Sequence, residues 1–270
     1  MSQSGKQRAN ESEVRQEEVR QYYRALHRAW GAQHWWPAET AFAVIVGTYL
    51  TQNTAWINVE RALANLRAAE LLSVSGIRTV SLRRLERLIR PSGYFRQKAR
   101  RLKTFVAFLD REYGGSLEEL LAQPTEKLRE ELLSLNGVGP ETADSILLYA
   151  GNHPVFVVDA YTRRIIERHG IMSANSDYEE IRGFFEQSLA SLVDEQAGQS
   201  ERPAFQREGS AFRGAFHPPS AMSTAPRSPM AQVYNEMHGF IVGVGKHYCG
   251  KAQPKCDGCP LQRFLPRVND

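Results

Sequence analysis

A chain of 270 residues can form one large domain or two modest ones with ample core. Hydrophobic residues make up 42% and charged residues 24%, the composition of an ordinary globular protein. No apolar run is long enough to span a bilayer and the polar N-terminus lacks a signal-peptide core, which argues against a membrane protein and predicts a cytoplasmic location. The net charge of +4 leans only mildly toward polyanionic partners.

The predicted elements are helices. Residues 1–13 are expected to be a disordered tail, followed by a helix from Val14 to Trp30. Apolar periodicity predicts further helices over 38–50, 54–70, 80–90, 95–113, 116–123, 125–134, 139–151, 159–169, 177–193 and 231–247. VFVV, residues 155–158, looks like a strand but is too short and isolated to build a sheet. The predicted fold class is therefore all-α.

One segment, residues 195–229, breaks this pattern. It is rich in Ser, Pro, Gly, Ala and Arg and shows no sustained period, so it buries too little to offset the entropy of ordering. We expect a flexible insertion there, although its three phenylalanines leave a binding motif open.

A tight turn lies in LNGVGPETA, residues 135–143, between two helical runs. Glycines let the chain turn and expose backbone N–H groups, and the next helix adds its positive N-terminal end, an arrangement that suits a DNA phosphate. By itself such a turn is also a common helix connector. The predicted DNA contacts of the turn are Gly137, Val138, Gly139 and Thr142.

An aspartate follows in VFVVDAYTRR, where Asp159 stands 18 residues after Glu141. With the turn, this spacing resembles the helix-hairpin-helix base-excision glycosylases, and specifically the endonuclease III family. The resemblance covers about Ala38–Arg168 and resumes at Met230. It implies that Asp159 is catalytic and that Gln52, in TQNT, lies at the DNA interface. Asp159 also suits a helix N-cap, and both roles can hold at once.

Glu141 stands where bifunctional members of that family carry a lysine. The lysine forms a Schiff base with the sugar, which a carboxylate cannot do. The resemblance therefore implies a monofunctional glycosylase without AP lyase activity. Glu141 enters the catalytic set only weakly, because an acidic residue in the first turn of a helix is favourable anyway.

Aromatic residues indicate which base leaves. HWWP, residues 34–37, with LTQNT, RPSGYFRQKA and the turn, is similar to the endonuclease-III-related 3-methyladenine DNA glycosylases. This implies that Trp36, Pro37 and Trp56 line a pocket for a flipped alkylated purine, whose positive charge suits aromatic walls. Tandem tryptophans are otherwise usual in a packed core.

The basic run of residues 86–103 is either a solvated helix face or a phosphate-binding surface. The resemblance places the equivalent segment near DNA, and Lys98 and Arg101 are its predicted contacts.

Three cysteines, Cys249, Cys256 and Cys259, match the first three positions of the C-x6-C-x2-C-x5-C pattern that holds a four-iron cluster in endonuclease III enzymes, but the fourth position is Leu265. A 4Fe–4S cluster is the first expectation. Zinc, or no metal, remains an alternative, and the fourth ligand could be solvent, His247 or Asp257.

The sequence thus predicts a monomeric DNA repair glycosylase acting on double-stranded DNA with a damaged base. A helical barrel over 34–150 would carry the hairpin, and a second helical domain would combine 14–33 with 151–270, with the active-site cleft between them. Two alternatives stay open: a glycosylase and AP lyase on oxidised pyrimidines that uses another lysine such as Lys246, and a DNA-binding protein without catalysis.

Overall fold

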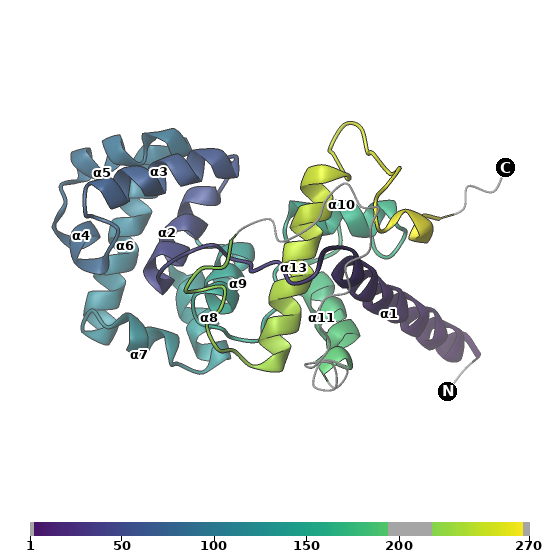
Figure 1. Ribbon diagram of the computed structural model, residues 1–270. Coiled ribbons are helices and arrows are strands. Elements are labelled where there is room, and N and C mark those ends of the chain that lie inside the picture. Colours follow the sequence, from purple (N-terminus) through teal and green to yellow (C-terminus); the bar gives the residue numbers. More distant parts are fainter. Residues whose placement is uncertain (1–2, 194–217, 267–270) are drawn as a thin grey trace. The chain divides into compact units, whose positions relative to one another are not determined.

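The computed structural model describes residues 3–193 and 218–266, with side chains from residue 10 onward. Over these residues the secondary structure is entirely helical, which confirms the predicted all-α class. The α-helices are α1 (Gln3–Trp30), α2 (Ala41–Thr51), α3 (Trp56–Ala68), α4 (Val74–Thr79), α5 (Leu82–Leu88), α6 (Phe95–Tyr113), α7 (Leu117–Leu121), α8 (Thr125–Ser134), α9 (Pro140–Tyr149), α10 (Ala160–Arg168), α11 (Tyr178–Leu189) and α13 (Pro229–His247) (Figure 1). Two 3-10 turns are η1 (Arg90–Ser92) and η2 (Gln262–Phe264).

The chain divides into two compact units. The first, called the hairpin unit, contains Trp36–His153 and Ser220–Ala225. The second, called the Asp159 unit, contains Met1–Trp35, Pro154–Pro219 and Pro226–Asp270. From the sequence alone, these boundaries were placed at residues 34 and 150, and the segment 220–225 was not assigned to the barrel.

The hairpin unit is built around α2, whose sequence AFAVIVGTYLT is buried almost throughout. Thr40 begins this helix by accepting a hydrogen bond from the backbone N–H of Ala43. Because α2 is apolar on every face, it needs cover on every face, and α3, α6 and α9 pack against it. The hairpin between α8 and α9 is therefore attached directly to the core of this unit.

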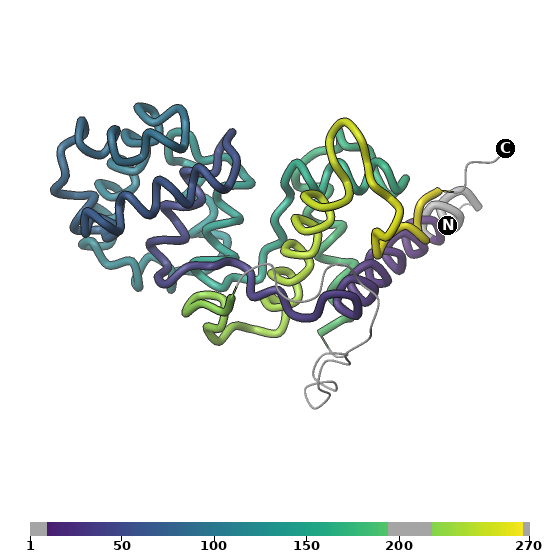
Figure 2. The backbone as a smooth tube through the Cα atoms, turned by 45° about the horizontal axis from the view of Figure 1, so that its top comes forward, coloured from purple at the N-terminus to yellow at the C-terminus, as the bar shows by residue number. Residues whose placement is uncertain are grey.

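The Asp159 unit is centred on α13, which packs against α1, α10 and α11 (Figure 1). Ser228 caps α13 at its N-terminus and Pro229 occupies its first turn. The C-terminal segment returns to α1, where the ring of Phe264 lies 4.9 Å from that of Tyr22 (Figure 2). The two ends of the described chain thus share one core.

Two sequence expectations need correction. Helix α1 begins at Gln3, within the tail that was expected to be disordered to residue 13. Glu, Gln, Lys, Arg and Ala dominate this stretch, and such straight side chains favour a helix even without an apolar stripe. A short helix, α4, also forms over Val74–Thr79 where none was predicted; Ser73 caps it, but six residues are too few to show a period.

The predicted flexible insertion, 195–229, lies mostly outside the described residues. Its last part is ordered against the start of the hairpin unit. The hydroxyl of Ser220 accepts a hydrogen bond from Ala38 N–H, and the N–H of Met222 donates to Ala38 O at 3.0 Å. Ser223 is buried and bonds back to Ser220. Flexibility is therefore wrong for Ser220–Ala225, because backbone groups at Ala38 hold that segment.

In the described part of the chain, no helix is both long and apolar enough to cross a membrane.

Candidate active site

The turn between α8 and α9 has the backbone that its glycines allow. Gly137 has a φ of +80°, a left-handed conformation that other residues adopt at a cost. Gly139 is the N-cap of α9 and is extended, and Pro140 follows in the first turn as predicted. Among the described residues nothing lies within 4 Å of the place where a Cβ on Gly139 would sit. The helix N-terminus is therefore open to a ligand at this point.

Four of the predicted DNA contacts belong to one hydrogen-bond network. The side-chain amide of Gln52 donates to Gly137 O and to Thr142 Oγ1, both at 3.0 Å. Arg101 in turn donates to Gln52 Oε1 at 2.6 Å and packs where a side chain on Gly137 would have to sit. Helices α2 and α6 thereby hold the hairpin turn from one side. Val138 is buried beneath the turn, so it offers backbone rather than side chain to any ligand.

The structure corrects the prediction that Lys98 contacts DNA. Its side chain is 2% exposed, and its ammonium donates to Leu50 O at 2.9 Å and to Ser92 O at 2.7 Å. Burial, helped by the nearby charge of Arg101, lowers the pKa of Lys98 to about 8. Its charge is used inside the unit, where it joins the end of α2 to the turn before α6, and it does not face a phosphate. The run's exposed cations are others: Arg87, Arg90, Arg96 and Arg100.

The tandem tryptophans separate. Trp35 belongs to the Asp159 unit, where the ammonium of Lys246 lies 5.5 Å from its ring centre. Trp36 belongs to the hairpin unit and is 7% exposed. Its ring packs edge-on against Trp56, 4.9 Å between centroids, and lies tilted against Tyr149 at 5.1 Å. The structure brings the two predicted pocket aromatics together, and Trp36 is also the core residue that the alternative interpretation expected.

Trp56 and Pro37 are only partly buried. Trp56 begins α3, and its indole N–H donates to Glu60 Oε1 at 2.9 Å.

Asp159 begins α10 as its N-cap. One carboxylate oxygen, Oδ1, accepts hydrogen bonds from the N–H and the hydroxyl of Thr162, at 2.8 and 3.0 Å. The Thr162 hydroxyl also accepts from the backbone N–H of Asp159, which completes a capping box. The carboxylate is thus held in one orientation, with the side chain 13% exposed.

The second oxygen of this carboxylate meets His238, a residue that the sequence analysis missed. Asp159 Oδ2 lies 3.7 Å from His238 Nε2. His238 projects from the buried face of α13, and burial lowers its pKa although the carboxylate acts in the opposite direction. The imidazole is therefore neutral at neutral pH. A lone histidine in an apolar helix was the available signal, but nothing in the sequence shows which helix faces Asp159.

Glu141 occupies the first turn of α9 with an exposed side chain. The hairpin, the aromatic pair and Glu141 belong to one unit, and Asp159 and His238 belong to the other. The cleft that the sequence predicts between the two domains stays a prediction.

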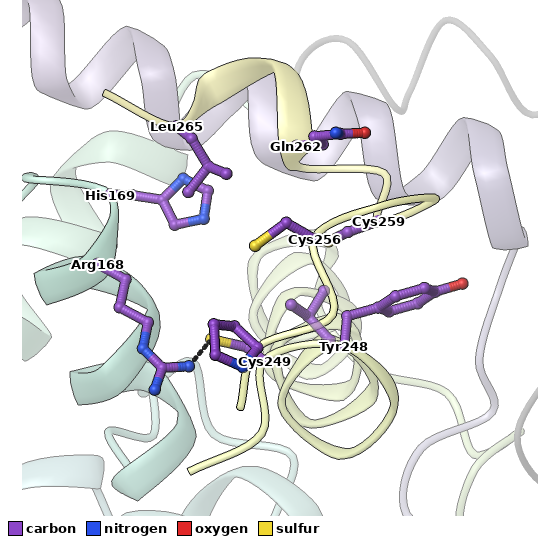
Figure 3. Close-up of a pocket in the computed structure, with 10 residues that line it drawn as sticks. Arg168, His169, Tyr248, Cys249, Cys256, Cys259, Gln262 and Leu265 are labelled. Carbon is purple, nitrogen blue, oxygen red and sulfur yellow. Dashed lines mark hydrogen bonds between the residues drawn. The ribbon is translucent and has the colours of Figure 1, made fainter. Parts of the chain in front are cut away.

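The three cysteines surround a cavity of about 260 Å³ in the Asp159 unit (Figure 3). Cys249 follows the end of α13, and its sulfur accepts a hydrogen bond from Arg168 Nη1 at 3.1 Å. The other lining residues are Arg168, His169, Val244, Tyr248, Pro254, Gln262 and Leu265. His247 and Asp257, the fourth ligands considered from the sequence, are exposed and do not line it. In the described ranges, no group of three or more His, Cys, Asp or Glu is arranged to hold a metal ion.

Comparison with known proteins shows the family to which the chain belongs. The family model of HhH-GPD superfamily base excision DNA repair proteins matches residues 46–191. A protein of Methanocaldococcus jannaschii, MJ1434, named as a candidate DNA repair glycosylase, is 39% identical over 92% of this chain and 96% of its own length. Endonuclease III of Thermotoga maritima is 31% identical over 82% of this chain and 80% of its own.

Among solved structures, the Helicobacter pylori 3-methyladenine DNA glycosylase MagIII, bound to 1,N6-ethenoadenine, superposes with a TM-score of 0.65 at 27% identity. The alignment covers 87% of this chain and 97% of that one. The region matched by the family model, residues 46–191, includes both the hairpin and Asp159. The chain belongs to the HhH-GPD superfamily of base excision DNA repair proteins, as a DNA glycosylase of the endonuclease III and 3-methyladenine glycosylase type.

Proposed function

We propose that this protein is a monofunctional DNA glycosylase that releases alkylated purines such as 3-methyladenine from double-stranded DNA. The observation that carries the proposal is the carboxylate of Asp159, fixed through Oδ1 by Thr162 in a chain whose hairpin turn offers an open helix N-terminus.

In the proposed reaction, the damaged nucleotide leaves the base stack and its sugar approaches Asp159. The glycosidic bond breaks toward an oxocarbenium-like sugar, and the carboxylate stabilises the positive charge at C1′ or directs a water molecule to it. An alkylated purine already carries positive charge, so its bond is weak and modest catalysis is sufficient. The edge-on pair of Trp36 and Trp56 supports an aromatic wall for such a base.

His238 has a positioning role in this proposal. With its neutral ring 3.7 Å from Oδ2, it disfavours rotation of the carboxylate and carries no charge that would compete with the sugar cation. Thr162 holds Oδ1 by two hydrogen bonds, and the His238 ring packs beside Oδ2.

The absence of lyase chemistry is proposed from Glu141, which replaces the amine that would attack C1′. Lys246, the other amine considered, lies over the ring of Trp35. Borohydride treatment of the protein on abasic-site DNA should trap no covalent adduct. A strong adduct would instead support the bifunctional alternative, and its loss in Lys246→Ala would identify the amine.

The deciding experiment is release of 3-methyladenine and 7-methylguanine from methylated duplex DNA, with strand nicking followed in the same tubes. We expect release without nicking. Asp159→Asn should reduce release at least ~100-fold while the melting temperature changes little, because asparagine also caps helices well. Full-rate release by this variant would remove Asp159 from the catalytic role, and no release by the wild type would favour a DNA-binding protein. Nicking of oxidised-pyrimidine DNA without alkyl-base release would favour the other enzyme.

The cavity among the cysteines is proposed to hold an iron–sulfur cluster through Cys249, Cys256 and Cys259. A single zinc ion needs its thiolates within about 2.3 Å of one point, whereas a cubane cluster spreads them over several irons. Three thiols around about 260 Å³ suit the second arrangement. A bound cluster would order the C-terminal loop, and we assign it no part in base release. Protein that contains zinc and no iron would support the zinc alternative, and protein that contains neither metal would support a site without metal.

A further inference from the structure

Three cysteines and the apolar side chain of Leu265 line the cysteine cavity. Figure 3 shows Leu265 on the same cavity as Cys249, Cys256 and Cys259, with its side chain directed toward His169. Position 265 is where the C-x6-C-x2-C-x5-C pattern of endonuclease III enzymes has its fourth cysteine. The methyl groups of leucine offer no electron pair to a metal.

Three polar residues on the cavity wall, His169, Gln262 and Arg168, already have hydrogen-bond partners in the protein. The His169 ring is bonded to the hydroxyl of Tyr22 at 2.9 Å and to the backbone of Phe264. The amide nitrogen of Gln262 donates to Asp257 Oδ1 at 3.4 Å. The guanidinium of Arg168, which has no lone pair to give, donates to Cys249 Sγ, Gly250 O and Lys251 O.

The loop that carries the cysteines is held by protein groups. Arg164 donates to Cys249 O at 2.7 Å, and Lys255 N–H donates to Tyr248 O at 2.7 Å. Cys259 N–H donates to Cys256 O, and both cysteines line the cavity. His247 and Asp257 are exposed and do not line the cavity that this loop forms.

From these contacts we infer that one iron of the cluster held by the three cysteines is bound by none of the described side chains, and that this iron binds a small anionic donor from solution, hydroxide or a thiolate. The inference rests on the cofactor proposed above. Its chemical consequence is that the fourth iron is exchangeable, whereas an iron held by cysteine is not.

The exchangeable iron can be detected by oxidation. A one-electron oxidant such as ferricyanide converts [4Fe–4S]²⁺ into [3Fe–4S]⁺, one released Fe²⁺ and one electron, which the oxidant accepts. Iron, sulfide and charge balance in this step, and no cysteine is oxidised. The product has an unpaired spin and gives an EPR signal, while the starting cluster gives none.

The test uses the full chain, reconstituted without oxygen from ferrous iron and sulfide, and treated with one equivalent of ferricyanide. Wild type and Leu265→Ala should each lose one of four irons and show the three-iron EPR signal. Leu265→Cys, which adds the missing thiolate, should keep four irons and stay EPR-silent. Ferrous iron and dithionite added to the oxidised wild type should restore the fourth iron and abolish the EPR signal, because [3Fe–4S]⁺, one electron and Fe²⁺ together give [4Fe–4S]²⁺.

Three results would overturn the inference: a wild type that takes up no iron, one that takes up only zinc, or a cluster that keeps all four irons under ferricyanide. The restoration step uses the wild type, so the test holds even where Leu265→Cys folds poorly. Base release measured on the same samples is a separate readout. A failure here leaves Asp159 as the catalytic carboxylate, and a failure of Asp159 leaves the iron count unchanged.

Discussion

At the scale of single residues, Asp159 combines two roles in one side chain. As an N-cap it accepts the N–H of Thr162, which stabilises the first turn of α10 by roughly 1 kcal/mol. The same bond fixes the carboxylate for the proposed chemistry. The hydrogen bonds of the capping box restrict the side-chain rotamer of Asp159. The N-terminus of α10 therefore pre-organises the carboxylate.

His238 provides the first prediction. Replacement by leucine removes the ring nitrogen that lies 3.7 Å from Oδ2, and base release should fall about 10- to 100-fold because the carboxylate loses its orientation. His238→Gln, which can keep a polar group near the same place, should retain most of the rate. Single-turnover release over a range of protein concentrations separates rate from affinity, and the effect should lie in the rate. Equal losses in both variants, with lowered melting temperatures, would reduce His238 to a packing residue.

Lys98 provides the second prediction, on how stability depends on pH. Its pKa of about 8 in the folded protein lies below the ordinary value of 10.5, so the unfolded chain binds more protons between these two pH values. Stability from this group therefore rises with pH from about 8 to 10.5. Relative to Lys98→Met, the wild type should gain up to about 3 kcal/mol of unfolding free energy across that window.

Urea unfolding at pH 7, 8, 9 and 10 measures this difference. Arg100→Met, an exposed position two residues along α6, is the matched control and should show no such trend. A difference between wild type and Lys98→Met that is flat with pH would contradict the buried, partly neutral lysine.

At the scale of elements, the α8–α9 hairpin is held from two sides. Gln52 and Arg101 hold the turn, and a paired charge joins the helices themselves. Arg129 on α8 donates two hydrogen bonds to Asp144 on α9, at 2.6 and 3.2 Å, and the Asp144 side chain is fully buried. Breaking such a pair leaves an uncompensated buried charge. The turn is therefore presented on a rigid support, as a phosphate site requires.

The two glycines of the turn give a matched pair for the third prediction. Gly137→Ala forces a side chain into a left-handed residue, 1.9 Å from Arg101 Nε, and should cost about 1–3 kcal/mol of stability. Gly139→Ala meets open space and should change stability by less than ~0.5 kcal/mol.

DNA binding separates structure from contact at these positions. If a phosphate approaches the N-terminus of α9, the added methyl of Gly139→Ala should weaken binding to abasic-site DNA although the fold is intact. Unchanged affinity in Gly139→Ala would move the phosphate away from this turn.

At the scale of the whole molecule, a net charge of +4 is too small to attract DNA by itself, so affinity depends on where the cations stand. Helix α6 shows this clearly. Lys98 is buried, whereas Arg101, three residues later, is only partly covered and reaches the hairpin network. Charge counted along the sequence would give the two residues equal weight.

The fourth prediction compares them directly. The logarithm of the DNA association constant should fall linearly with the logarithm of salt concentration, by about 0.9 per phosphate neutralised. Arg101→Met should make this slope shallower by roughly that amount, while Lys98→Met should leave it unchanged. Fluorescence anisotropy from low to moderate salt gives both slopes. A shallower slope in Lys98→Met alone would reverse the correction made to Lys98.

Local patterns were sufficient for much of the fold and for part of the site. The turn glycines, Pro140 and the N-cap at Asp159 are decided within a few residues of each position, because backbone conformation and capping are short-range effects. The helical class followed from periodicity, which each segment carries by itself. Helix α1 was the exception, since good helix formers without an apolar stripe read as a tail.

Long-range contacts could not be obtained in that way. The burial of Lys98, the approach of His238 to Asp159 and the binding of Ser220–Ala225 to Ala38 each join segments distant in the chain. Their geometry depends on how whole helices pack, and no spacing rule encodes it. The sequence by itself determined the all-helical class and the hairpin, and it was enough to mark Asp159, Glu141 and the three cysteines as candidate site residues. Only the tertiary structure decided which charges are buried, which histidine meets the carboxylate and that Leu265 shares a cavity with the cysteines, because packing, not residue type, sets what each side chain meets.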